Sequence, residues 1–282
     1  MSTLRRRAFA PNWTMRAVWI GLAIYVVYAS SLLNVTWARI LVGLDNGARF
    51  LGRMWPPEFT RWQLLMEGLL ESLQIAVIAS FLGILLSLPI GLLAARNLMP
   101  AVVTVPARAL IAFARSFHPI IVAIIFVKAI GFGALAGILA LILASVGFVA
   151  KLFAEAIEEI SLKQVEAVRA TGASFMGVVI MGVLPQVLSR FIGFSTYQLD
   201  SNLRNSTMVG IVGGGGIGGT LFSAFQRFDY DFVAAILISI ITLVGGQVVL
   251  ERVFGYDTAL AIIIEFVGGV VFIAMLLRGS RT

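Results

Sequence analysis

A run of polar side chains interrupts the apolar sequence between Ser195 and Thr207. It contains Tyr197, Gln198, Asp200, Ser201, Asn202, Arg204, Asn205 and Ser206. Hydrocarbon would penalise these groups by several kcal/mol in total, so they must face protein or water. Asp200 and Arg204 are four residues apart with the acid first, a spacing that allows an ion pair on one face of a helix.

This polar segment has two interpretations. Its hydrogen-bond donors and its fixed positive charge suit a translocation pathway for an oxyanion. The same residue types also join helices to one another, here across a homodimer interface. Both hold if the pathway is the interface, although pairing of Asp200 with Arg204 would make the site electrically neutral. The predicted lining is Asp200, Asn202, Arg204, Asn205, Ser206 and Thr207.

Three more polar residues lie in the middle of another apolar run. Arg115 and Ser116 come about one turn before His118, which precedes a proline. We predict that these three residues face the same pathway. The alternative for a lone histidine is a buried packing role.

A glycine-rich run follows the polar segment and includes Gly213, Gly214, Gly215, Gly216 and Gly218. It lacks the Gly-Lys-Ser/Thr ending of a phosphate-binding loop and follows no strand, which argues against a nucleotide site. Glycine permits positive φ and close backbone approach. The run therefore predicts a gate or a tight turn where two subunits meet, with a purely structural turn as the alternative.

The composition defines the setting of these residues. Of 282 residues, 60% are hydrophobic and 12% are charged, whereas an average soluble domain is roughly one quarter charged. The net charge of +7 is spread over loop ends rather than clustered with aromatics, which disfavours nucleic acid. The chain has no cysteine and a single histidine, so we expect no metal site, and we find no catalytic constellation.

The apolar runs predict an all-α bundle of six to seven membrane spans. They lie near residues 17–35, 69–95, 102–130, 134–157, 187–212 and 232–254, with a less regular run at 259–277. We divide the chain into a first helix with its N-terminal arm (1–36), an interfacial segment (37–67), a core membrane domain (68–255) and a C-terminal apolar segment (256–282).

The charged stretch from 158 to 169 is the clearest water-facing helix inside the chain. Its Glu166-Ala-Val-Arg-Ala-Thr-Gly172, with Val183-Leu-Pro185 after it, resembles the EAA loop of binding-protein-dependent ABC importer permeases. The third-position alanine is replaced by valine, and Gly182 stands where isoleucine is usual. The resemblance implies that loop 162–185 is cytoplasmic and docks on an ATPase. Its coupling residues would be Glu166, Ala167, Arg169, Gly172, Leu184 and Pro185.

Within that loop, glycine at position 172 is expected to end the coupling helix. Pro185 is expected to break off the following segment so that the chain can re-enter the membrane. Four predicted spans precede the loop, so a cytoplasmic loop places the N-terminus in the cytoplasm as well.

Other motifs are similar to the phosphonate-type branch of this family, whose members import phosphonate, phosphite or phosphate. They include Met54-Trp-Pro-Pro-Glu-Phe, Ala114-Arg-Ser-Phe-His-Pro and Leu203-Arg-Asn-Ser-Thr-Met-Val-Gly. The resemblance implies a type I importer fold in the bacterial inner membrane. It also implies a homodimer with two ATPase subunits that bind ATP and Mg, a periplasmic or lipid-anchored binding protein, and no cofactor on this chain. The alternative is an ion-coupled transporter or channel that uses Asp200, Arg204 and His118.

Overall fold

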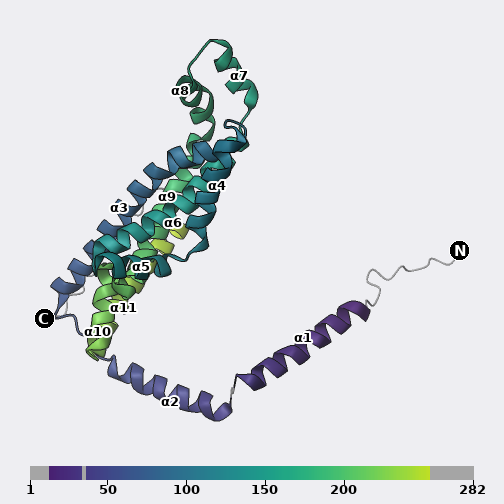
Figure 1. The fold of residues 1–282 in the computed structure, drawn as a ribbon. Coiled ribbons are helices and arrows are strands. Elements are labelled where there is room, and N and C mark those ends of the chain that lie inside the picture. The colour runs from purple at the N-terminus through teal and green to yellow at the C-terminus, as the bar shows by residue number, and fades with distance from the viewer. Residues whose placement is uncertain (1–12, 34–35, 255–282) are drawn as a thin grey trace. The chain divides into compact units, whose positions relative to one another are not determined.

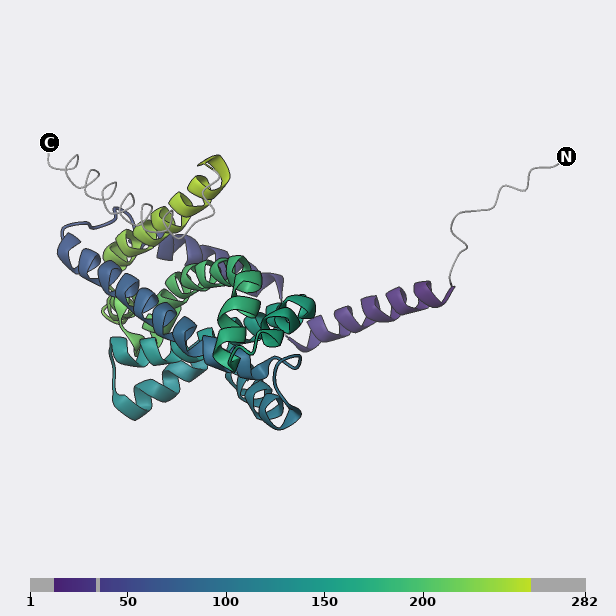
Figure 2. The ribbon, with the colours of Figure 1, turned by 90° about the horizontal axis from the view of Figure 1, so that it is seen from above.

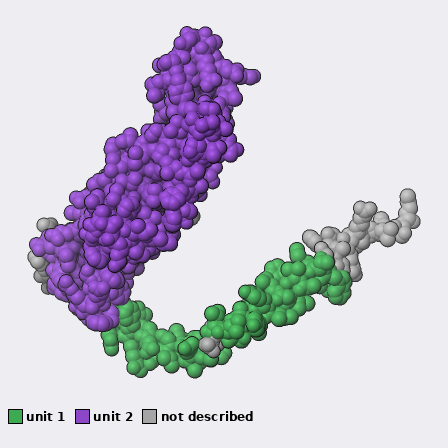
Figure 3. All heavy atoms as spheres, in the orientation of Figure 1, with its two compact units in different colours: residues 1–55 green, residues 56–282 purple. Residues whose placement is uncertain are grey.

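The computed structural model describes residues 13–33 and 36–254, with side chains up to residue 242. The chain divides into two compact units, residues 1–55 and residues 56–282, coloured separately in Figure 3. The division falls after Trp55, before the predicted boundary near residue 67. The loop that follows Trp55 is bonded within the second unit, where the Glu58 N–H donates to the Asp231 carbonyl.

The first unit holds two helices. The first, α1 (Trp13–Leu32), is apolar and long enough to cross a membrane. The second, α2 (Trp37–Arg53), begins at Thr36, whose side chain accepts a hydrogen bond from the Arg39 N–H. Large apolar side chains and three arginines alternate along α2, a pattern that suits a helix lying in the membrane interface.

The second unit is a bundle of helices and turns, without a strand among its described residues. Its elements are α3 (Trp62–Ala94), α4 (Ala101–Ser116), α5 (Pro119–Ile130), α6 (Ala134–Glu158), α7 (Leu162–Ala170), α8 (Phe175–Val178), the π turn η1 (Val179–Val183), α9 (Leu184–Val209), the π turn η2 (Gly210–Gly214), α10 (Gly216–Gln226) and α11 (Tyr230–Phe254). The all-α prediction is confirmed.

Helices α3, α6 and α9 pack against one another in this unit (Figures 1 and 2). Small residues allow the close contact. A Cβ at Gly83 of α3 would lie 2.4 Å from the Ser145 Cβ of α6, and one at Gly91 would lie 2.8 Å from the Phe153 ring. Van der Waals packing between small residues is a principal source of helix association in lipid.

Four helical segments of the described chain are long and apolar enough to cross a membrane. They are α1, α3, α6 and the stretch 175–214 that runs from α8 to η2. The bent pair α4 and α5 makes a fifth span if it counts as one. The predicted sixth span corresponds to α11, and the predicted seventh, at 259–277, lies outside the described residues.

The predicted span over 102–130 is divided into two helices with a sharp bend between them. Helix α4 ends at Ser116, α5 starts at Pro119, and the chain bends by 89° between them. Proline disfavours the helical conformation for the residue before it, and His118 accordingly has an extended backbone. The bend places Arg115 and Ser116 at a helix end.

The expectation that Pro185 breaks the chain is wrong. Pro185 occupies the first turn of α9, directly after the π turn η1. The wider π turn η1 joins α8 to α9, and both residues that flank it have right-handed helical dihedral angles. The chain therefore enters the membrane domain as one helical segment.

Candidate functional site

The loop with the coupling motif lies at one end of the second unit, where α7 and α8 project together, and α10 lies at the opposite end (Figure 1). Helix α7 ends at Ala170, and Gly172 follows with φ +78°, a conformation that favours glycine. Glu166, Ala167 and Arg169 are exposed on α7. The helix therefore presents a slim surface with one carboxylate and one guanidinium.

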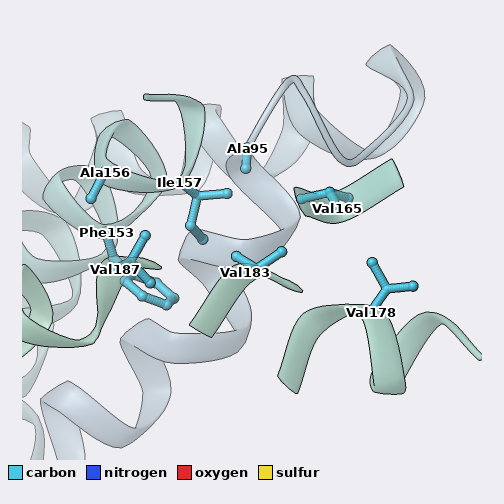
Figure 4. Close-up of a cluster of buried hydrophobic side chains, with 8 residues drawn as sticks. All are labelled: Ala95, Phe153, Ala156, Ile157, Val165, Val178, Val183 and Val187. Carbon is cyan, nitrogen blue, oxygen red and sulfur yellow. The ribbon is translucent and has the colours of Figure 1, made fainter. Parts of the chain in front are cut away.

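A cluster of apolar side chains anchors α7 to the bundle (Figure 4). Val165 is buried in it, on the side of α7 away from solvent. Its other buried members come from the ends of α3, α6, α8, η1 and α9: Ala95, Phe153, Ala156, Ile157, Val178, Val183 and Val187. The cluster thus packs α7 against the ends of three membrane helices.

Glycine at position 182 has a steric reason in this structure. A Cβ on Gly182 would lie 3.3 Å from the Val165 Cα, closer than an ordinary contact. The residue is buried where η1 passes under α7. Glycine at position 182, where the family pattern has isoleucine, therefore allows α7 to approach the bundle closely.

Gln186 joins the two ends of the loop, and the sequence reasoning assigned it no role. Its side-chain oxygen accepts a hydrogen bond from the Ser161 N–H at 3.0 Å. Its amide nitrogen donates to the carbonyls of Ser161 at 3.4 Å and Gly182 at 2.6 Å. One turn later, Arg190 pairs with Glu159. The N-terminal end of α7 is thereby tied to α9.

The polar segment of α9 has a buried face. Gln198 and Asn202 are buried, and both amide nitrogens donate to the Ser145 hydroxyl of α6, at 3.0 Å and 2.8 Å. Asn202 also donates to Ser80 of α3 at 2.9 Å and accepts from Gln198. Ser206, likewise buried, donates to the Leu203 carbonyl. Asn202 and Ser206 therefore lie inside the subunit, in contact with α3 and α6 or with their own helix.

The opposite face of α9 is open. Arg204 pairs with Asp200 at 2.6 Å, and about half of the Arg204 side chain is exposed. Tyr197 is exposed on the same side of the helix, and Asn205 and Thr207 are partly exposed. A surface of this polarity is costly against lipid. It has to meet water or another protein surface.

Arg115, Ser116 and His118 lie at the break between α4 and α5 and are exposed. Ser116 donates to the Phe113 carbonyl. The His118 Nδ1 caps α5 by accepting from the Ile120 N–H at 3.3 Å. Arg115 packs its aliphatic stem against Gly147 of α6. These three side chains therefore lie together at the break between α4 and α5. Asp200 and Arg204 lie on a different helix, α9.

The glycine run makes a sharp reversal between α9 and α10. Gly213, Gly215 and Gly216 have positive φ. The Gly213 carbonyl accepts from the Gly133 N–H at 2.9 Å, which ties the reversal to the turn before α6. A Cβ on Gly218 would lie 1.9 Å from the Thr207 carbonyl oxygen. Only glycine fits at such contacts. Gly214 is buried against Gly137 of α6.

No cluster of histidine, cysteine and carboxylate side chains suited to a metal occurs among the described residues. The geometry provides a protruding, anchored helix and a polar membrane segment.

Comparison with known proteins agrees with this arrangement. Residues 87–277 match the family described as binding-protein-dependent transport system inner membrane component. A phosphite transport system permease protein, PtxC of Stutzerimonas stutzeri, is 39% identical over 84% of this chain and 88% of that protein. A phosphate-import permease protein, PhnE of Mycolicibacterium smegmatis, is 38% identical over 83% of this chain, but the match spans only 43% of that relative.

A solved structure of the MetNI methionine ABC transporter in an inward-facing conformation is also similar. It covers 70% of this chain and 97% of the solved chain, at a TM-score of 0.57 and 27% identity. The predicted fold class, a type I ABC importer permease, is confirmed by this likeness and by the family match. The family match and the spanning helices indicate a multi-pass inner-membrane protein. This chain belongs to the family of binding-protein-dependent transport system inner membrane components.

Proposed function

We propose that the chain is the membrane permease of an ATP-driven importer that moves phosphonate, phosphite or phosphate into the cytoplasm. The chain itself is not catalytic in this proposal. A separate ATPase binds ATP and Mg and drives transport through α7, and a periplasmic or lipid-anchored binding protein delivers the anion. The N-terminus and α7 lie on the cytoplasmic side.

One observation carries the proposal: α7 is exposed on one face and anchored on the other. Glu166, Ala167 and Arg169 are free to meet a partner, while Val165 is buried among the ends of membrane helices. A helix that only connected two membrane spans in solvent would not need to be anchored in this way. The arrangement suits the transfer of a rigid-body movement from an ATPase to the membrane domain.

The substrate class rests on the relatives and on the open face of α9. PtxC and PhnE are named for phosphite transport and phosphate import. Arg204 offers a half-exposed guanidinium, and Asn205 and Thr207 lie beside it with polar side chains. We place this face along the pathway and the homodimer interface. We assign Asn202 and Ser206 to the subunit core and the glycine reversal to a gate.

The proposal is tested by uptake of labelled phosphate, phosphite and methylphosphonate in cells whose other uptake systems for these anions are deleted. We expect Glu166→Ala and Gly172→Val to abolish uptake and substrate-stimulated ATPase activity while the protein still inserts. Valine at position 172 would be strained at φ +78°. Asp45→Ala, which removes an exposed carboxylate in the first unit, is the matched control and should transport normally. Normal uptake by both loop variants would contradict the proposal.

The same assay separates the alternative of an ion-coupled transporter. Uptake that survives ATP depletion under a maintained ion gradient would favour that alternative. Here Asp200 is paired with Arg204, and the His118 Nδ1 accepts a backbone hydrogen bond.

A further inference from the structure

A cavity of about 240 Å³ lies between α4 and α6, separate from the polar face of α9. Three cations line it: Arg108 and Arg115 from α4, and Lys151 from α6. Glu155, one turn after Lys151, and apolar side chains such as Ala112 complete the wall. Arg108, Lys151 and Glu155 lie on α4 and α6, outside the coupling loop and the polar face of α9.

The charges in this cavity do not balance. The Arg108 guanidinium is 2.5 Å from the Glu158 carboxylate and also donates to the Ala94 carbonyl. Lys151 makes a long contact of 3.5 Å with Glu155, and both side chains are about half exposed. Arg115 has no carboxylate partner among the described residues. Three cations thus face two carboxylates, and the excess positive charge lies at Arg115.

The side-chain stem of Arg115 lies beside the middle of α6. A Cβ on Gly147 would lie 2.9 Å from the Arg115 Cγ, so Arg115 passes α6 at that glycine. Gly147 precedes the end of α6 at Glu158 by eleven residues, which is roughly 16 Å at the rise of an α-helix. That is about half of a hydrocarbon core of roughly 30 Å. A charge at such a depth requires water or a counter-ion.

Helical spacing aligns the two walls. Gly147, Lys151 and Glu155 are four residues apart, so they lie along one face of α6. Arg108, Ala112 and Arg115 lie along the facing side of α4 in the same way. The break after Ser116 ends α4 at this level. Discontinuous helices of this kind border substrate sites in many transporters.

We propose that this cavity binds a phosphate-type oxyanion between the Arg115 guanidinium and the Lys151 ammonium. Arg115 can form two parallel hydrogen bonds to such an anion, and Lys151 adds a charge from the opposite wall. Identification of the anion as the transported substrate rests on the proposed function. The phosphate of an anionic phospholipid headgroup has the same chemistry and is the other source.

Because the chain contains no cysteine, a single introduced thiol can report on access to the cavity. Ala112→Cys places a single thiol on the cavity wall, and its reaction with the neutral reagent N-ethylmaleimide reports access. The transporter is purified with its ATPase subunit in nanodiscs of phosphatidylcholine. Inorganic phosphate, phosphite or methylphosphonate is added, with chloride of equal ionic strength as the reference. Arg96→Cys, in the exposed turn between α3 and α4, is the control thiol.

We expect each of the three oxyanions to slow labelling at Ala112→Cys and to leave Arg96→Cys unaffected. In the Ala112→Cys background, Arg115→Gln should raise the oxyanion concentration that halves the labelling rate about tenfold or more. This is the effect of losing a charge-assisted hydrogen bond. Arg115→Lys should restore part of the protection. Equal elution volumes of these variants on size exclusion would show that they fold alike.

A second arm identifies the source of the anion. Without soluble oxyanion, replacing phosphatidylcholine by phosphatidylglycerol should leave the labelling rate unchanged if the ligand is a soluble anion. Slower labelling at Ala112→Cys alone would assign the site to a lipid headgroup. Absence of protection in both arms, or protection that Arg115→Gln does not alter, would overturn the site. Protection without ATP-dependent uptake would contradict the proposed function instead.

Discussion

At the scale of single residues, the sequence pointed to the coupling motif but not to the residue that holds it. Gln186 follows the motif directly, yet its partner Ser161 is 25 residues earlier, and no local pattern reveals that pairing. The buried face of α9 was more accessible to prediction. Gln198, Asn202 and Ser206 recur every four residues, which indicates one helix face. Their residue types could not decide between a pathway and packing.

We expect Gln186→Ala to reduce uptake several-fold while the complex keeps its basal ATPase activity. Without the amide, Ser161 loses its hydrogen bonds to α9, so the start of α7 follows movements of the bundle less closely. The free energy of unfolding should fall by only about 1 kcal/mol, so loss of folding would not explain the transport defect. The measurement compares uptake with ATPase activity in proteoliposomes. Gln63→Ala, an exposed glutamine of α3, is the control. Equal coupling ratios in all three proteins would contradict this role.

At the scale of elements, apolar run length predicted the membrane helices well, because crossing hydrocarbon imposes a minimum length. The prediction missed the bend at one proline and expected a break at another. Pro119 starts a helix after a right-angled bend, whereas Pro185 lies in the first turn of a helical segment that continues through it. Proline is compatible with a helix start in both cases. Whether the preceding chain continues as helix depends on tertiary contacts, such as those under η1, which the sequence does not display.

We expect Gly83→Ala to destabilise the second unit. The added methyl group would lie 2.4 Å from the Ser145 Cβ, so α3 and α6 would have to separate. Overpacking of this kind costs roughly 1–3 kcal/mol. The check is thermal unfolding in detergent, followed by tryptophan fluorescence. Gly21→Ala in α1, where nothing lies within 4 Å, should not lower the midpoint. An unchanged midpoint for Gly83→Ala would show that the helices are not packed this closely.

The loop before α3 should carry a dependence on pH. The Thr60 hydroxyl and the Arg61 guanidinium donate hydrogen bonds to Glu58 and lower the pKa of its carboxyl group below the ordinary value of 4.5. Arg61 also holds Asp229 of the loop before α11 at 3.0 Å. Because the folded pKa is lowered, the stabilisation by Glu58 is fully present above pH 4.5 and is lost as pH falls through the folded pKa.

Thermal midpoints of the wild type and of Glu58→Gln should therefore differ at neutral pH and converge in acid below pH 4.5. Glu67→Gln, an exposed carboxylate of α3, serves as the reference for a general effect of charge. A difference that persists in acid would mean that Glu58 acts through packing rather than through its charge.

At the scale of the whole molecule, the composition predicted the membrane setting, and the motif spacing predicted the family. Neither the composition nor the motif spacing could show which part of the folded surface is available for contact with other subunits. The open face of α9 combines Tyr197, which is 54% exposed, with the half-exposed Arg204. A polar face on a membrane helix implies a partner or water. In a symmetric dimer, the same face of each copy would meet near the two-fold axis.

Cross-linking can test the homodimer because every introduced cysteine is the only thiol of the chain. We expect Tyr197→Cys to form a covalent dimer with a short bismaleimide in membranes, since α9 would face its own copy. Ile125→Cys on α5, 56% exposed, should remain monomeric if that surface faces lipid. Tyr197→Cys and Arg204→Cys that both stay monomeric would contradict an interface along α9. Cross-linking of Tyr197→Cys to a different co-purified permease would show that the membrane domain is a pair of distinct subunits and not a homodimer.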